Sequence, residues 1–204
     1  MTVLLALVFA IGTASAGSAL EAEHVRISGD IEQLANRQLW PGVEKKFAEL
    51  KKLGVEPSFE DLLHGAYAAR ALGNAQNVYD RLKVAARIKG TREVVDWLYV
   101  IDANYGQVEL IATPPRGITL ETSEVPFDPD QRTAVEAAAE RVKKEGTFSG
   151  LLPRGTYTYA GQQFTVEPGI NVRIEVSPKM KKTDGELIRV TTTPVDAGAP
   201  APGE

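Results

Sequence analysis

The apolar residues of this chain change their spacing near Tyr105, and that change separates two kinds of structure. From about Ser28 to Tyr105 they recur at intervals of three and four residues, which places them on one face of a helix. Beyond Tyr105 they alternate with polar residues, as in strands that bury one face. The pattern therefore predicts an α+β protein in which helices come first and a β-rich part follows.

The helical part carries an internal repeat. Two pairs of apolar stripes superimpose at a spacing of 35 residues: Val43, Phe47 and Leu50 on Val78, Leu82 and Ala85, and Ile27, Ile31 and Leu34 on Leu62, Ala66 and Ala69. Trp97 and Ile101 begin a third, partial copy. Stacked helical hairpins bury their apolar faces against one another. We therefore expect about three hairpins, which form a domain over 17–106.

The second copy resembles a tetratricopeptide repeat. The positions that this family fills with large, small and turn residues are occupied by Leu62, Gly65, Ala66, Gly73, Val78, Leu82 and Ala85. The sequence departs from the family pattern at Gly90, where a proline is usual, and at Ala69, where a tyrosine is usual. Generic helical hairpins would produce much of the same periodicity. The resemblance implies a concave groove, lined by the first helix of each hairpin, that binds a partner protein.

The β-rich domain is expected over 107–192. Alternating apolar residues lie on both sides of the turn-forming segment 113–117: Val108, Leu110 and Ala112 before it, Ile118 and Leu120 after it. This arrangement is typical of a β-hairpin. A helix is then predicted at 129–145, because Asp128 can cap it, Pro129 suits its first turn and Gly146 ends it.

Strands return after this helix, and the segment 151–176 resembles the small modules called PEGA or carboxypeptidase-regulatory-like. It contains a leucine-proline-x-glycine-x-tyrosine turn ending at Tyr157, a strand pair that turns at Ala160-Gly161, and a closing strand over 170–176. The resemblance implies an antiparallel, sandwich-like β domain with one inserted helix. A further strand at 187–192 would complete the sheet, and 193–204 is expected to be a disordered tail of Pro, Ala, Gly and acidic residues.

The N-terminus predicts export. An apolar run over 3–11 precedes small residues that include Ala14 and Ala16, so 1–16 reads as a signal peptide cleaved after Ala16. The run is shorter than the ~20 residues that a membrane-spanning helix needs. The chain has no cysteine, which excludes a lipid-anchored lipoprotein, disulfides and thiolate metal sites. We expect a periplasmic or secreted protein without a transmembrane anchor after cleavage.

The sequence offers little for catalysis, so no catalytic, cofactor-binding or metal-ligating residue is predicted. There are two histidines, His24 and His64, and no phosphate-binding or nucleophile-elbow motif. Asp128 and Asp130 are explained by helix capping. A pI near 5.4 gives no basic field to attract nucleic acid. We therefore expect a protein that is not an enzyme and binds no cofactor.

The predicted binding site follows from the tetratricopeptide resemblance. The positions that would face the groove are Glu60, Leu63, Tyr67, Arg70, Val95, Leu98, Asp102 and Tyr105. Tyrosine and arginine often anchor interfaces, because they combine a large contact area with a directional polar end. An alternative is that Tyr67 and Tyr105 only cover the junction with the β domain. Trp40 and Trp97 are expected to be buried.

These features favour a scaffold or adaptor that binds protein partners of a cell-envelope machine, with peptidoglycan as a further possible partner. Such exported combinations resemble accessory components of secretion, motility or cell-surface systems in bacteria such as myxobacteria. A second hypothesis is a cell-wall or glycan-binding module, or a small envelope hydrolase, that uses Tyr157 and Tyr159 as a carbohydrate surface. A third is a structural subunit that oligomerises through an exposed sheet edge.

Overall fold

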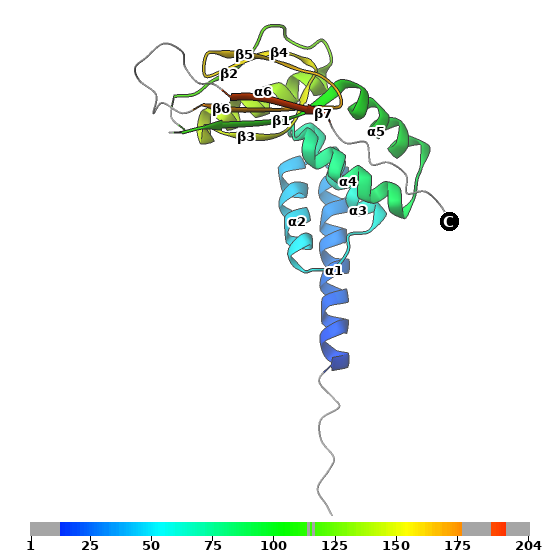
Figure 1. Cartoon of the computed structure of the whole chain (residues 1–204). Helices are drawn as coiled ribbons and strands as arrows, with labels where there is room; N and C mark the ends of the chain where they lie inside the picture. The colour runs from blue at the N-terminus through cyan, green and yellow to red at the C-terminus, as the bar shows by residue number, and fades with distance from the viewer. Residues whose placement is uncertain (1–12, 114, 116, 177–188, 195–204) are drawn as a thin grey trace, which may run out of the picture.

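The computed structural model describes residues 13–113, 115, 117–176 and 189–194, and shows an α+β protein with its helical part first (Figure 1). The helical part contains α1 (Thr13–Asn36), α2 (Trp40–Lys52), α3 (Phe59–Ala71), α4 (Ala75–Ile88) and α5 (Arg92–Asn104). The second part contains β1 (Tyr105–Ala112), β2 (Leu120–Thr122), α6 (Pro129–Glu145), β3 (Phe148–Pro153), β4 (Gly155–Tyr159), β5 (Gln162–Val166), β6 (Ile170–Val176) and β7 (Arg189–Pro194).

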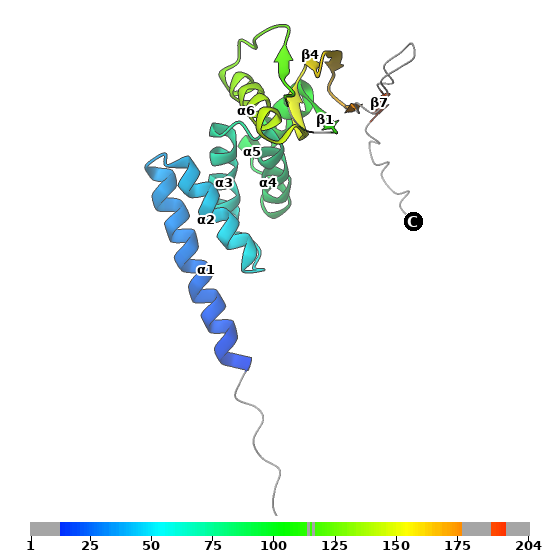
Figure 2. The same cartoon turned by 90° about the vertical axis from the view of Figure 1, so that its left-hand side faces the viewer.

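The helical stripes predicted from the sequence form one core. The residues that pair at the 35-residue spacing, such as Val43 with Val78 and Phe47 with Leu82, are all buried in it apart from the half-buried Leu34 and Trp97. The long helix α1 extends beyond α2 (Figure 2), and its buried face begins only at Ile27. Ser58 and Asn74 cap α3 and α4, which fixes where those helices begin.

The second part consists of two sheets and α6 around a second core. One sheet has the order β3-β1-β6-β7 and the other the order β2-β4-β5. Val108, Leu110, Val172 and Ile174 from the first sheet meet Tyr157 and Phe164 from the second sheet and Val142 from α6 in this core. Asp128 caps α6 as predicted, because its side chain accepts from the backbone N–H groups of Asp130 and Gln131.

Three predictions about the β strands are wrong. β1 and β2 do not form a hairpin, because β1 is a central strand between β3 and β6 while β2 pairs with β4. The strands are not all antiparallel, since β1 and β6 run parallel. The last strand reaches Pro194, so Thr193, expected in the tail, pairs with Asn171 in the ladder.

The tryptophans also differ from the prediction. Trp40 and Trp97 are only partly buried. Trp40 is the first residue of α2, and Trp97 faces side chains of α3 that are themselves partly exposed. Of the predicted signal peptide, residues 1–12 lie outside the described residues, as do residues 195–204 of the predicted tail.

Candidate functional site

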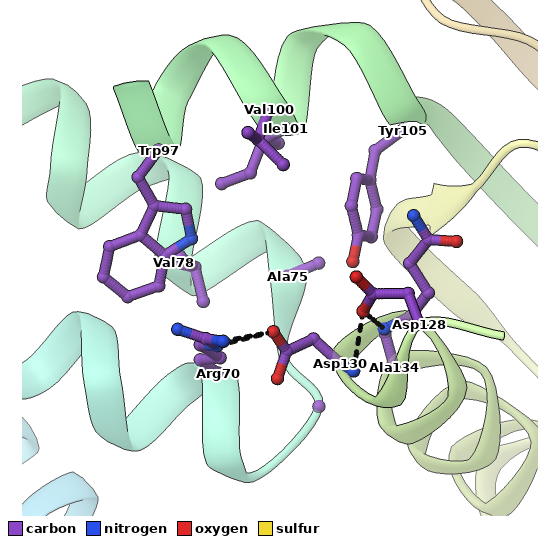
Figure 3. Close-up of a pocket in the computed structure, with 12 residues that line it drawn as sticks. Arg70, Ala75, Val78, Trp97, Val100, Ile101, Tyr105, Asp128, Asp130 and Ala134 are labelled. Carbon is purple, nitrogen blue, oxygen red and sulfur yellow. Dashed lines mark hydrogen bonds and ion pairs between the residues drawn. The ribbon is translucent and has the colours of Figure 1, made fainter. Parts of the chain in front are cut away.

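The eight residues of the predicted groove differ in their exposure and in their contacts. Three of them lie where α3, α5 and α6 meet: Tyr67, Arg70 and Tyr105. Figure 3 shows Arg70 and Tyr105 around a small pocket there. Leu63 and Leu98 are half-buried against the helical core. The remaining three, Glu60, Val95 and Asp102, are exposed on α3 and α5.

The junction side chains are largely paired with one another. The Nε of Arg70 donates to Asp130 on α6 at 2.7 Å, and its guanidinium lies 5.3 Å from the centre of the Trp97 ring. The centres of the Tyr67 and Trp97 rings lie 5.2 Å apart, and the Tyr67 hydroxyl donates to the Glu93 carboxylate. This hydrogen bond and burial raise the pKa of Tyr67. These contacts join α3, α5 and α6.

The pocket at this junction is small. Its volume is about 60 Å³, and its lining includes Tyr105, Asp128 and Val100. Burial, and then the nearby carboxylates of Asp128 and Asp130, raise the pKa of Tyr105 to about 12, so its hydroxyl is protonated at neutral pH. Ligand pockets are typically ~300–1,000 Å³. This space can therefore hold a few water molecules, and the residues around it act mainly as a structural joint.

A much larger groove lies on the other side of the helical part, between α2 and α4. Its volume is about 450 Å³. Its lining comes from α2, the segment after α2, one residue of α3, and α4: Glu44, Phe47, Ala48, Lys51, Gly54, Val55, Glu56, Pro57, Leu62, Asn77, Asp80, Arg81 and Val84. We refer to these residues as the α2–α4 groove.

The floor of the α2–α4 groove is built around Arg81, which is only 8% exposed. Its Nη1 donates to the carbonyl of Gly65 and both of its Nη atoms donate to the Glu44 carboxylate at 2.7 Å. The guanidinium lies 4.1 Å from the centre of the Phe47 ring. A guanidinium that donates two hydrogen bonds to one carboxylate is pre-organised, and here it fixes the distance between α2 and α4. The floor is consequently rigid.

The rim of the α2–α4 groove carries charged and apolar side chains. Lys51 is exposed on α2, while Asp80 is exposed on α4 and accepts a hydrogen bond from Gln76 at 3.0 Å. Val84, 41% exposed, adds an apolar side chain to the α4 side. Glu56, also exposed, adds a carboxylate beside α2, so the rim carries charges of both signs around a floor of apolar side chains and the Arg81–Glu44 pair.

Sequence reasoning assigned the binding face to the first helix of each hairpin and missed this groove on the second helices. Two signals for it were available. Arg81 stands within the otherwise apolar stripe of Val78, Leu82 and Ala85, and Val84 lies beside that stripe. A charged residue in a core stripe indicates a buried ion pair or a nearby opening.

The tyrosines of the carbohydrate hypothesis point into the core, as their alternation with Phe164 and Val166 predicts. Tyr157 is 1% exposed and Tyr159 is fully covered. Their hydroxyls donate to the carbonyls of Pro153 and Gly146. Neither ring is therefore available as a stacking platform for a sugar.

Within the described part of the chain, no group of three or more His, Cys, Asp or Glu side chains is placed to hold a metal ion. Among the same residues, no helix combines the length and the apolar character that crossing a membrane requires. No family model, no curated protein and no solved structure matches this chain.

Proposed function

We propose that this protein is a non-enzymatic adaptor of the bacterial cell envelope that binds a helix of a partner protein in the α2–α4 groove. The observation that carries this proposal is the open groove of about 450 Å³ between two helices, lined by apolar side chains around the Arg81–Glu44 pair. Its volume lies within the ~300–1,000 Å³ typical of binding pockets.

An amphipathic helix suits the groove because both walls are helix faces. α2 contributes residues 44, 47, 48 and 51, and α4 contributes 77, 80, 81 and 84, each with the spacing of one helical face. A third helix laid between two such faces presents apolar residues at the same spacing. Lys51 and Glu56 beside α2 and Asp80 on α4 favour a partner helix whose polar flanks carry both acidic and basic side chains.

Export through a cleaved signal peptide is part of the proposal. It is supported by the burial pattern of α1, in which residues 19–22 are exposed and the buried face begins at Ile27. Cleavage after Ala16 would leave that buried face complete. N-terminal sequencing of the protein from an envelope fraction tests this: we expect it to begin at Gly17, and an intact N-terminus in the cytoplasmic fraction would contradict it.

We further propose that the helical part is a tetratricopeptide-like array and the β part a PEGA-like, sandwich-like module. Burial at the 35-residue spacing supports the first, although α5 is followed directly by β1 and not by a second helix. The hydrogen bond from the Tyr157 hydroxyl to the Pro153 carbonyl, within the leucine-proline turn, supports the second. The parallel pairing of β1 with β6 departs from a wholly antiparallel sandwich.

Blocking the groove tests the proposed function. Because the chain lacks cysteine, Ala48→Cys and Val84→Cys each create one thiol for a bulky maleimide, and Gln163→Cys on β5 is the matched control. The labelled proteins are used to capture partners from an envelope extract. We expect the control to capture one envelope protein that both groove-labelled proteins lose.

Two results would overturn the proposal. One is that all three labelled proteins capture the same proteins, which would place the binding site elsewhere. The other is that the labelled control captures no specific partner.

A further inference from the structure

One aromatic side chain outside the groove is almost completely exposed. Phe127 is 99% exposed, and Val125 is 66% exposed two residues before it, with Pro126 between them. Both lie in the loop that joins β2 to α6. Single exposed apolar residues are common on protein surfaces, but a phenylalanine that touches almost nothing in its own fold is unusual.

The loop that carries Phe127 is held by hydrogen bonds on both sides. Arg132 on α6 donates from Nε to the carbonyl of Pro126 at 3.4 Å and from Nη2 to that of Phe127 at 3.3 Å. Asp128 caps α6 with bonds of 2.8 and 3.1 Å. The Thr122 hydroxyl donates to the carbonyl of Glu124 at 2.7 Å. The ring is thus presented from an ordered backbone.

This pre-organisation is what an interface anchor needs. A ring that is already positioned loses little conformational freedom when it enters a pocket, so most of its burial contributes to affinity. The anchor also adjoins the junction, because Asp128 lines the small pocket together with Val100, which is 50% exposed.

The charges around the anchor indicate the chemistry of its partner. Four carboxylates lie within ten residues: Glu121, Glu124, Asp128 and Asp130. Two basic side chains lie beside them: Arg70 pairs with Asp130, and Arg132 donates to the loop's own carbonyls. Such surroundings repel an anionic bilayer surface and attract lysine and arginine.

We propose that Phe127, with Val125, is an anchor that enters an apolar pocket rimmed by lysine or arginine on a second partner protein. The site is distinct from the α2–α4 groove, because no residue of the β2–α6 loop lines that groove. This inference does not depend on occupancy of the groove.

Photo-crosslinking locates the partner. Benzoylphenylalanine replaces Phe127 in the full-length protein, and the same residue at Gln163 is the control. After irradiation of intact cells, we expect a protein adduct from position 127 that position 163 does not give, with the crosslinked residue lying in an apolar pocket beside basic side chains. Adducts with lipid, with a second copy of this chain, or equally from both positions would overturn the proposal.

Affinity measurements with the identified protein complete the test. We expect Phe127→Ala to weaken binding by about tenfold or more, and Glu124→Lys to weaken it and reduce its dependence on salt. Tyr99→Ala, which removes another exposed aromatic ring (72% exposed), should leave binding unchanged. Because Phe127 has almost no contacts in the fold, its removal should not shift the melting temperature. Equal affinities for wild type and Phe127→Ala would refute the anchor.

Discussion

At the scale of single residues, Arg81 connects three helices of the helical part. It joins α4 to Glu44 on α2 and to the Gly65 carbonyl on α3, and it stacks on Phe47. Gly65 is needed for this approach, because a Cβ there would lie 2.9 Å from the Phe47 ring and 3.2 Å from the Arg81 side chain. The same contacts form the floor of the α2–α4 groove.

We predict that Arg81→Ala lowers the free energy of unfolding by about 3 kcal/mol, because it leaves a cavity and an unpaired Glu44. Glu44→Gln should lower the free energy of unfolding by only about 1 kcal/mol, since the Glu44 side chain is 30% exposed and the amide keeps one acceptor oxygen. Urea unfolding measures both variants. Equal losses would show that the arginine contributes through its charge alone.

Three buried or half-buried tyrosines make the stability of the fold depend on pH in the alkaline range. Burial raises the pKa of Tyr105 and Tyr159 to about 12, and that of Tyr157 higher still, from an ordinary value of 10.0. The neutral hydroxyl is therefore favoured in the folded state, and the stability it confers is complete below pH 10.0 and lost as pH rises through about 12.

Tyrosinate absorbance and circular dichroism, followed together from pH 9 to 13, check this prediction. We expect the absorbance of these tyrosines to rise only as the circular dichroism signal is lost, at roughly pH 12. Titration of all six tyrosines near pH 10 with the fold intact would contradict it.

Side-chain placement could be predicted where the backbone pattern alone determines it. The inward direction of Tyr157 and Tyr159 and the cap at Asp128 are confirmed. The expected burial of Trp97 is wrong, because its exposure depends on Tyr67 and Arg70, which meet it only after α3 and α5 have packed. The role of Arg81 likewise depends on partners 16 and 37 residues away.

At the scale of elements, one close contact between the two parts of the molecule is made by a turn. Gly73, between α3 and α4, has a φ of +72° and lies against α6, where an added Cβ would meet the Thr133 carbonyl and come within 2.7 Å of the Ala137 Cβ. Gly54, after α2, has a φ of +71° with nothing within 4 Å.

Substituting each of these two glycines tests the contact with α6. Gly54→Ala should lower the free energy of unfolding by about 1 kcal/mol, the usual penalty for an alanine in the left-handed backbone conformation. Gly73→Ala should cost about 3 kcal/mol, because α6 must also move away from the turn. Thermal or urea unfolding compares the two variants, and similar losses would mean that α6 does not press on the turn.

Helices and their ends were predictable from the sequence, whereas the pairing of strands was not. The range 129–145 and the turn at Gly73 match the structure, since caps, glycines and apolar spacing are local signals. The hairpin expected between β1 and β2 is wrong, because β1 finds its partners in β3 and β6, about 40 and 60 residues along the chain. The α2–α4 groove was also missed, since it depends on how far apart two helices settle.

At the scale of the whole molecule, the helical part and the β part are joined without a linker. α5 ends at Asn104 and β1 begins at Tyr105, so the expected boundary between residues 106 and 107 lies inside a strand. The ion pair between Arg70 and Asp130 and the packing of Gly73 on α6 add two further connections.

We therefore predict that the two parts unfold in one transition. Both tryptophans, Trp40 and Trp97, lie in the helical part and report on it by fluorescence. A dye on Gln163→Cys reports on the β part. The urea midpoints from the two probes should coincide, and midpoints that clearly differ would show two independently stable domains.

A partner helix in the α2–α4 groove would cover α2 and α4, and hydrogen–deuterium exchange of the protein alone and bound to its captured partner measures this cover. We expect slower exchange of backbone amides in α2 and α4 on binding, with no change in β4 and β5. Unchanged exchange in α2 and α4, with protection confined to other elements, would contradict it.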